Sequence, residues 1–175
     1  MTEFRCRQNW SSECEKALND HINKEYQASY QYHCLSTYFD RDDVGYPQLV
    51  KYFNKASLEE REHADKFMKY QNKRGGKVEL FTLPKLSTDF KKKNNFFNAL
   101  NHALQLEKNV NQSLLDLHKV ASDNNDPQFS DYIEGEFLKE QVEAISEISK
   151  MITHLERLGN DKHGVWEFCN SLESM

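Results

Sequence analysis

The stretch that decides the fold is LVKYFNKASLEEREHADKFMKY, residues 49–70. Every third or fourth residue in it falls on one stripe, as in a helix that turns one face to the core of a bundle. The stripe consists of Leu49, Phe53, Ala56, Glu60, His63, Phe67 and Tyr70. Glu60 and His63 stand where leucines are expected, and their spacing of three residues places both side chains on one helical face. Because an unpaired buried carboxylate costs several kcal/mol or takes up a proton, the pattern predicts a pairing partner, a water-filled cavity or a metal ion beside Glu60.

The composition favours one domain built from a few long helices. The chain of 175 residues has only three prolines and six glycines, which is fewer turn-forming residues than a sheet-rich fold requires. Hydrophobic residues make up 38% of the chain and charged residues 29%, which suits long helices with one buried stripe and broad solvent-exposed faces. The net charge of −5 argues against a partner that needs a basic face, so we expect neither nucleic-acid nor membrane binding.

Cysteine spacing and the N-terminal composition bear on the compartment. The cysteines form no C-x-x-C pair and no zinc-like spacing, which favours reduced thiols: Cys6, Cys14, Cys34 and Cys169. Residues 1–10 are polar and carry arginines, unlike a secretory signal. No apolar run approaches the ~20 residues of a membrane span. We therefore expect a cytoplasmic protein.

Caps and turns divide the chain into four long helices and a short fifth one. Within one domain of residues 1–175, the expected helices cover about 12–40, 46–74, 95–122, 127–159 and 163–172. Residues 75–94 form the connection between the second and third helices, and residues 77 to about 94 lack a helical stripe. About 18 extended residues reach ~60 Å, whereas a helix of about 28 residues is ~42 Å long, so this connection can travel the whole bundle. The sequence thus predicts an all-α four-helix bundle of two antiparallel hairpins joined by one long crossover.

The other three long helices also place polar residues in their apolar seams. Glu25 and Tyr32 fall in the first helix, Glu107 in the third and Gln141 in the fourth. Taken alone, each glutamate is more simply a half-exposed position. Together with Glu60, however, they would place three carboxylates in one core, which requires cations. An oxygen-rich set with one imidazole suits iron(II), manganese or zinc better than copper(I).

Four motifs carry a resemblance to a known family: YFDRDD at residues 38–43, EEREHA at 59–64, LEKNVNQSL at 106–114 and EQV at 140–142. On these motifs the chain resembles ferritin of the animal heavy-chain, ferroxidase-bearing type over nearly its whole length. The resemblance implies a ferritin-like bundle with a short fifth helix. It also implies self-assembly, alone or with co-assembling ferritin subunits, into a hollow octahedral shell of about 24 subunits. The implied activity is iron storage, in which dioxygen oxidises iron(II) and the iron(III) is kept as a mineral.

The same resemblance implies a transient di-iron site whose residues are Glu25, Tyr32, Glu60, His63, Glu107 and Gln141. Glu25, Glu60 and His63 would hold one iron ion. Glu60 would bridge to a second ion, which Glu107 and Gln141 would share. Iron would be the substrate, and other divalent metals would also occupy the site. Because the amide of Gln141 is a weak neutral ligand, we expect the second iron to be loosely held and to leave after oxidation.

Two pairs of carboxylates outside this site also match the family. Glu59 and Glu62 would face the interior of the shell and gather iron(III), although a solvated helix face is the simpler alternative. Asp131 and Glu134 would line three-fold pores that concentrate cations, near His118, although complementarity to the helix dipole would also explain them. The remaining histidines show no useful partner spacing and are expected at the surface or internally satisfied: His21, His33, His102, His154 and His163.

Three rival functions remain open from the sequence. A catalytically poor structural subunit would have lost Glu25, Glu60 or His63, and all three are present. A di-iron enzyme that activates oxygen for an organic substrate would want a second Glu-x-x-His, but Leu138 stands three residues before Gln141. A plain helical bundle used for interaction would not bind iron. The sequence therefore favours an iron-storing ferroxidase.

Overall fold

The computed structural model describes residues 4–86, 95–159 and 161–172, and every regular element in these ranges is helical. The elements are α1 (Ser12–Phe39), α2 (Pro47–Lys73), α3 (Asn95–Asp123), α4 (Pro127–Ile133), the π-helical turn η1 (Glu134–Leu138), α5 (Lys139–Leu158) and α6 (Lys162–Leu172). The predicted all-α class with a short last helix is confirmed. Within the described ranges, no helix combines the length and the apolar character needed to cross a membrane.

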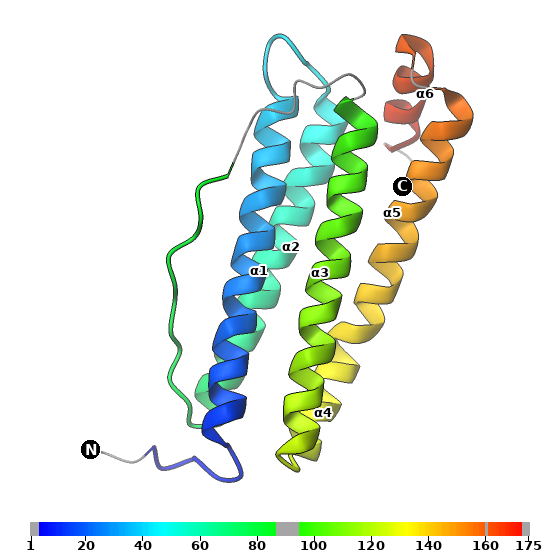
Figure 1. The fold of residues 1–175 in the computed structure, drawn as a ribbon. Helices are drawn as coiled ribbons and strands as arrows, with labels where there is room; N and C mark the ends of the chain where they lie inside the picture. Colours follow the sequence, from blue (N-terminus) through cyan, green and yellow to red (C-terminus); the bar gives the residue numbers. More distant parts are fainter. Residues whose placement is uncertain (1–3, 87–94, 160, 173–175) are drawn as a thin grey trace.

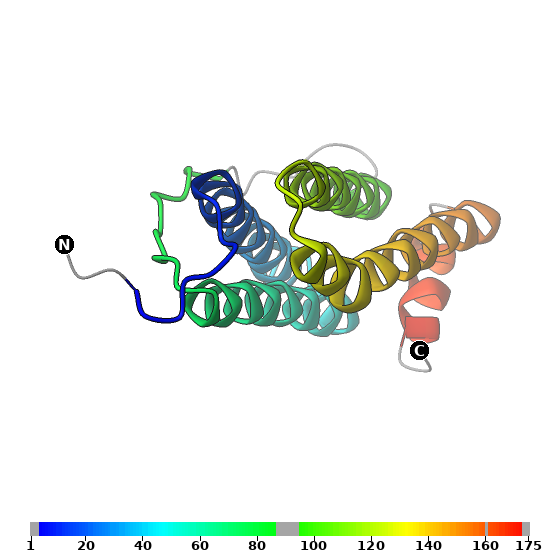
Figure 2. The same cartoon turned by 90° about the horizontal axis from the view of Figure 1, so that it is seen from below.

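Two helical hairpins form the bundle (Figure 1). α1 and α2 make the first hairpin, and α3 pairs with the continuous helix formed by α4, η1 and α5. Figure 2 shows the helices around a common core, with α6 beside the C-terminal end of α5. The heptad-like stripe of α3 is buried along its whole length: Leu100, Ala103, Glu107, Val110, Leu114, Leu117 and Ala121. Packing of such stripes places any polar residue they contain inside the bundle.

The described part of the long connection runs extended along α1 (Figure 1), held by two buried asparagines. The Asn19 amide donates to the carbonyl of Lys77 at 2.9 Å and accepts from the N–H of Glu79 at 3.0 Å. The Asn23 amide makes the same pair of contacts with the Glu79 carbonyl at 2.9 Å and the Phe81 N–H at 2.7 Å. Four helical residues rise ~6 Å and two extended residues span ~6.6 Å, so the two repeats match. The side chains of α1 therefore satisfy backbone groups that would otherwise pair with a strand.

The π-helical turn lies where buried side chains recur every four residues, at Phe129, Ile133, Phe137 and Gln141. The twelve residues between the first and the last of these would make ~3.3 turns of a plain α-helix, which leaves Gln141 rotated by ~120° from Phe129. A π turn accommodates one extra residue and brings Gln141 back to the core face. The core face consequently passes through Phe137, which is 2% exposed, while Leu138 is only half-buried.

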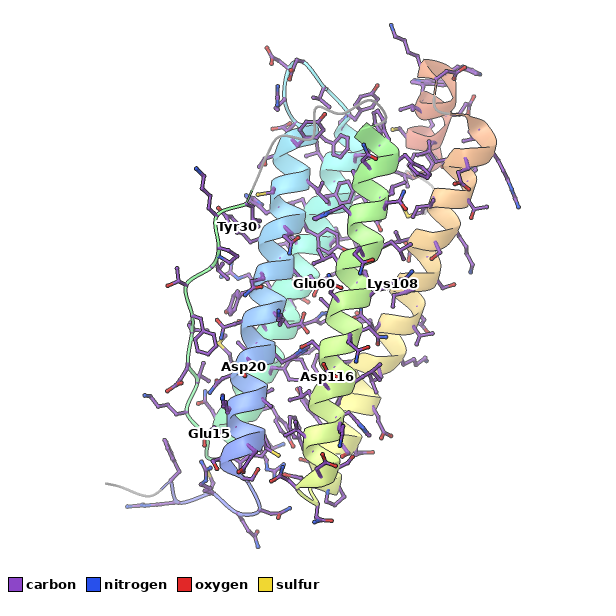
Figure 3. All side chains as sticks on the ribbon, in the orientation of Figure 1. Glu15, Asp20, Tyr30, Glu60, Lys108 and Asp116 are labelled. Carbon is purple, nitrogen blue, oxygen red and sulfur yellow. The ribbon has the colours of Figure 1, made fainter. Side chains whose placement is uncertain are left out.

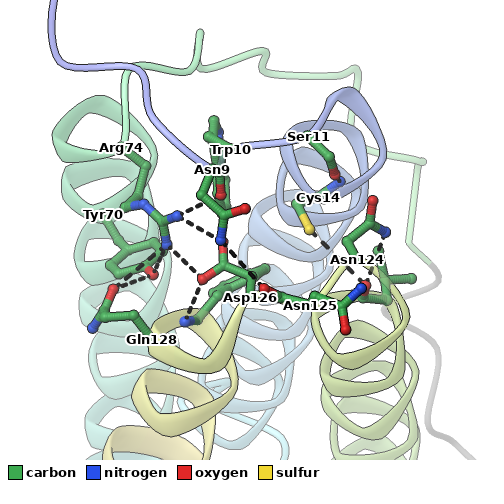
Figure 4. Close-up of polar contacts among 12 residues, drawn as sticks. Asn9, Trp10, Ser11, Cys14, Tyr70, Arg74, Asn124, Asn125, Asp126 and Gln128 are labelled. Carbon is green, nitrogen blue, oxygen red and sulfur yellow. Dashed lines mark hydrogen bonds and ion pairs between the residues drawn. The ribbon is translucent and has the colours of Figure 1, made fainter.

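A polar cluster joins the N-terminal segment to the end of α2 and the start of α4 (Figure 4). Nη2 of Arg74 lies 2.6 Å from Oδ2 of Asp126 and donates to the Asn9 carbonyl at 2.8 Å. The guanidinium also lies 4.6 Å from the centroid of the Trp10 ring. Asp126 is 2% exposed and caps α4 by accepting from the N–H of Phe129 at 3.0 Å. One ion pair thus fixes three chain segments at this end of the bundle.

The last helix, α6, docks on the end of α5 at a glycine. A Cβ atom on Gly164 would lie 2.2 Å from the carbonyl oxygen of Gly159 and 2.4 Å from that of Leu158. Val165 and Phe168 follow it and are buried, at 3% and 1% exposure. The close approach of the two helices therefore requires a residue without a side chain at position 164.

Candidate metal centre

Three of the predicted ligands meet inside the bundle, and Figure 3 shows one of them, Glu60, about midway along it. Glu25 on α1 and Glu60 and His63 on α2 offer ligand atoms that all lie within 4.8 Å of one another. Glu25 is 1% exposed and Glu60 5%. His63 is half-buried, with its Nδ1 3.5 Å from Oε2 of Glu60. The seams of α1 and α2 thus place two carboxylates and an imidazole at one level.

The other predicted residues adjoin this group from α1, α3 and α5. The Tyr32 hydroxyl donates to Oε1 of Glu107, and the Gln141 amide donates to Oε2 of the same carboxylate. The Gln141 amide also donates to the backbone carbonyl of Glu107 at 3.0 Å. Tyr32, Glu107 and Gln141 line one cavity of about 220 Å³ together with Glu60 and His63. The structure therefore brings together all six residues predicted for the central site.

Three buried carboxylate oxygens at the level of Glu25 and Glu60 have no hydrogen-bond partner among the described residues. They are both oxygens of Glu25 and Oε2 of Glu60. Buried polar groups are nearly always paired, and an unpaired carboxylate in a protein interior is costly. Such oxygens on two carboxylates beside an imidazole fit a bound cation, because one divalent ion would satisfy an oxygen of Glu25 and Oε2 of Glu60 at once.

Burial and mutual repulsion make this cluster hold protons when no metal is bound. Burial, and next the charge of Glu25, raise the pKa of Glu60 to about 8. Burial and the charge of Glu60 raise the pKa of Glu107 to about 7, and burial also raises the pKa of Glu25. Burial acts to lower the pKa of His63, but the carboxyl groups of Glu60, Glu25 and Glu140 outweigh it and raise that pKa to about 9. A metal ion would have to displace these protons.

The four peripheral carboxylates are exposed and lie in two separate places. Glu59 lines the central cavity at its outer part, and Glu62 is exposed one turn further along α2. Asp131 and Glu134 line a surface pocket near the α3–α4 turn. Nε2 of His118 lies 2.6 Å from Oε1 of Glu134 in that pocket. These two residues therefore lie apart from the central cluster.

Two residues near the centre were not predicted. His21 is 1% exposed, with its Nε2 2.7 Å from Oε1 of Glu25 and its Nδ1 2.8 Å from Oγ of Ser113. Burial lowers the pKa of His21 to about 3, so its imidazole is neutral. Glu140, at the rim of the cavity, has its Oε1 3.4 Å from Nε2 of His63. A signal for His21 was present in the sequence, because it precedes Glu25 by four residues and so lies one turn away on the same face.

Comparison with known proteins agrees with this fold. The family described as "Ferritin-like domain" matches residues 15–158. The chain is 52% identical over 164 residues to "Ferritin, chloroplastic" of Malus baccata var. xiaojinensis and 50% identical over 165 residues to "Ferritin-1, chloroplastic" of Nicotiana tabacum. Each alignment covers 93% of this chain and 65% of the relative. The chain therefore spans just under two thirds of the length of these relatives.

These relatives correct two of the predictions. They are plant proteins named chloroplastic, so the prediction of a cytoplasmic protein is wrong. Reduced thiols argue only against an oxidising compartment, and a plastid satisfies this condition equally well. The plant relatives likewise support the family but not the animal heavy-chain type within it.

The family match covers most of the chain, and half of the aligned residues are identical to those of the plant relatives. The helices from α1 to α5 fall largely within the range of that match, and α6 lies beyond it. This chain belongs to the ferritin family.

Proposed function

We propose that this protein oxidises iron(II) with dioxygen at the central cluster and stores the product as an iron(III) mineral. The observation that carries the proposal is the set of three unpartnered, buried carboxylate oxygens on Glu25 and Glu60 beside His63. A cluster that served only the fold would be expected to pair these oxygens with hydrogen-bond donors. The same three residues argue against a purely structural subunit.

The ligand set favours oxidation of the ion that it binds. Glu25, Glu60 and Glu107 supply hard anionic oxygens, which stabilise iron(III) more than iron(II). Two iron(II) ions give up one electron each, and one dioxygen accepts both electrons together with two protons. Gln141 contributes a neutral amide in place of a fourth carboxylate, so the ion next to it would be held less tightly and could leave as product. His63 completes the set from α2.

The cavity provides a route between the cluster and the surface. Its outer lining comes from α2 and α5 and includes four exposed glutamates: Glu59, Glu140, Glu143 and Glu147. Among the described residues of this lining, Lys55 is the one lysine or arginine. A mouth with excess negative charge concentrates cations, so iron would enter and leave between these two helices.

Assembly and compartment belong to the same proposal. Copies of the chain would form a hollow octahedral shell of about 24 subunits, in which the outer carboxylates face the interior or line pores. Asp131 and Glu134 would guide iron through the three-fold pores. The names of the relatives indicate a plastid as the site of action.

The test of the central site is aerobic oxidation of iron(II), followed by absorbance, with particle size measured by gel filtration. Wild type should oxidise iron rapidly, whereas Glu60→Ala/His63→Ala should be slower by about 100-fold or more while the particle survives. A matched control replaces the same residue types at exposed positions of α1, as Glu13→Ala/His33→Ala, and should keep the wild-type rate. Equal, slow oxidation by all three proteins would contradict a working centre.

The outer carboxylates are tested separately by Glu59→Ala/Glu62→Ala. This variant should slow the growth of the mineral while sparing the initial oxidation, because it changes exposed side chains and leaves the buried ligands in place. Light scattering at high iron loading measures the growth. Mineral growth at the wild-type rate would remove these two residues from the proposal.

A further inference from the structure

We propose that His21 is a positioning residue of the metal centre: its Nε2–H holds Oε1 of Glu25, so that Oε2 of Glu25 is presented to the metal ion. The inference rests on the proposed function, since it assigns a partner to one of the proposed ligands. Neither atom of the His21–Glu25 contact has another hydrogen-bond partner among the described residues. The two atoms lie 2.7 Å apart.

The contact from α3 is compatible with the His21 tautomer that this role requires. A neutral imidazole has one N–H and one acceptor nitrogen. If the Ser113 hydroxyl donates to Nδ1 across their 2.8 Å contact, the hydrogen is on Nε2 and faces the carboxylate. The opposite tautomer would direct a lone pair at Oε1 of Glu25, which is repulsive when that carboxylate is ionised, as metal binding requires. In that arrangement Ser113 would hold His21 in the form that donates to Glu25.

The ring of His21 is held in place by its surroundings. It is 1% exposed and meets the Phe67 ring edge to face, with the centroids 4.9 Å apart. The Nε2–H is not aligned for a hydrogen bond to Glu25, although the distance is short. A small rotation of the carboxylate would align it. Both unpartnered oxygens of Glu25 would then be satisfied, Oε1 by His21 and Oε2 by the metal.

The geometry favours this indirect role over direct ligation. The ligand atoms that lie within 4.8 Å of one another belong to Glu25, Glu60 and His63, and His21 is not in that set. Partners that orient a ligand from the side away from the metal typically change metal affinity by about 10- to 100-fold when removed. An effect of that size is expected for His21.

The test is calorimetric binding of Zn²⁺, a redox-inert probe, to the metal-free assembled protein. His21→Leu should bind the first ion about 10-fold or more weakly. His21→Gln should stay within about threefold of wild type, because its amide N–H₂ can donate to Glu25 from a similar position. Ser113→Ala, which keeps the imidazole but frees its tautomer, should lie between these two. In iron oxidation, His21→Leu should raise KM more than it lowers kcat.

The outcomes separate the inference from the proposed function. Wild-type affinity in His21→Leu would overturn the inference, and so would equal losses in the leucine and glutamine variants, since those would make His21 a ligand itself. If His21→Leu does not fold, Ser113→Ala and His21→Gln decide the matter, because the inference requires the first to be the weaker binder. Wild-type protein that fails to bind Zn²⁺ at all would instead refute the proposed site.

Discussion

Metal binding at the central cluster should release protons, and the number should fall as pH rises. Near pH 7 both Glu60, with a pKa of about 8, and His63, with a pKa of about 9, hold a proton when no metal is bound. A metal ion needs the ionised carboxylate and the neutral imidazole. When the first ion binds, Glu60 and His63 together should therefore release about two protons near pH 7 and about one near pH 8.5.

The same linkage fixes how affinity depends on pH. Each released proton changes the apparent affinity tenfold per pH unit, so the affinity for Zn²⁺ should rise by roughly 100-fold from about pH 6.5 to about pH 7.5. Titration calorimetry in buffers of different ionisation enthalpy counts the protons directly. The control is Glu60→Gln, which has no carboxyl proton to lose and should release about one proton fewer. Identical heats in all buffers, or an affinity that does not change with pH, would refute the assignment of these pKa values to the ligands.

The structure supports three further predictions. Without metal, the folded state holds the Glu60 proton more tightly than the unfolded state does, because the pKa of Glu60 is raised from 4.5 to about 8. This contribution to the free energy of unfolding is complete below pH 4.5 and is lost as the pH rises towards about 8. Thermal unfolding of the metal-free protein should therefore occur at lower temperature in mild alkali unless Zn²⁺ is added. Arg74→Met leaves the buried Asp126 carboxylate without its ion pair and should lower the free energy of unfolding, measured in urea, by about 3 kcal/mol. The control Lys73→Met, at the exposed neighbouring position, should change the free energy of unfolding by less than about 0.5 kcal/mol. Gly164→Ala places a methyl group against the end of α5 and should accelerate amide hydrogen exchange in α6 alone; unchanged protection of α6 would contradict the close contact.

The central site could be predicted because its residues interrupt regular seams. Spacings of three and four fix which face of a helix is buried, and in α3 every member of the predicted seam is buried, including Glu107. Glu25 and Glu60 follow from the same rule on α1 and α2. Since packing of four such seams leaves only one core, carboxylates at a similar distance from the helix ends must meet there.

Other features depend on contacts that the periodicity does not contain. His21 is buried because Phe67 of α2 and Ser113 of α3 lie against it, and neither is near it in the sequence. The π turn, by contrast, left a local signal, namely the repeated interval of four from Phe129 to Gln141. An interval of four over three successive steps is too long for a plain α-helix, and recognising it would have predicted the extra residue.

The asparagine contacts along α1 fix the number of residues in the segment that they bind. Because Asn19 and Asn23 bind only main-chain atoms, the side chains between Lys77 and Phe81 can vary in evolution without loosening the attachment. A change of length has a different effect. Losing one residue would turn the backbone N–H and C=O groups of the segment away from the asparagines, whereas losing two would shift the segment by one full repeat and restore the pairing. Gln27 and Gln31 continue the interval of four along the same helix. This part of the chain should therefore tolerate changes of composition freely and changes of length only in pairs.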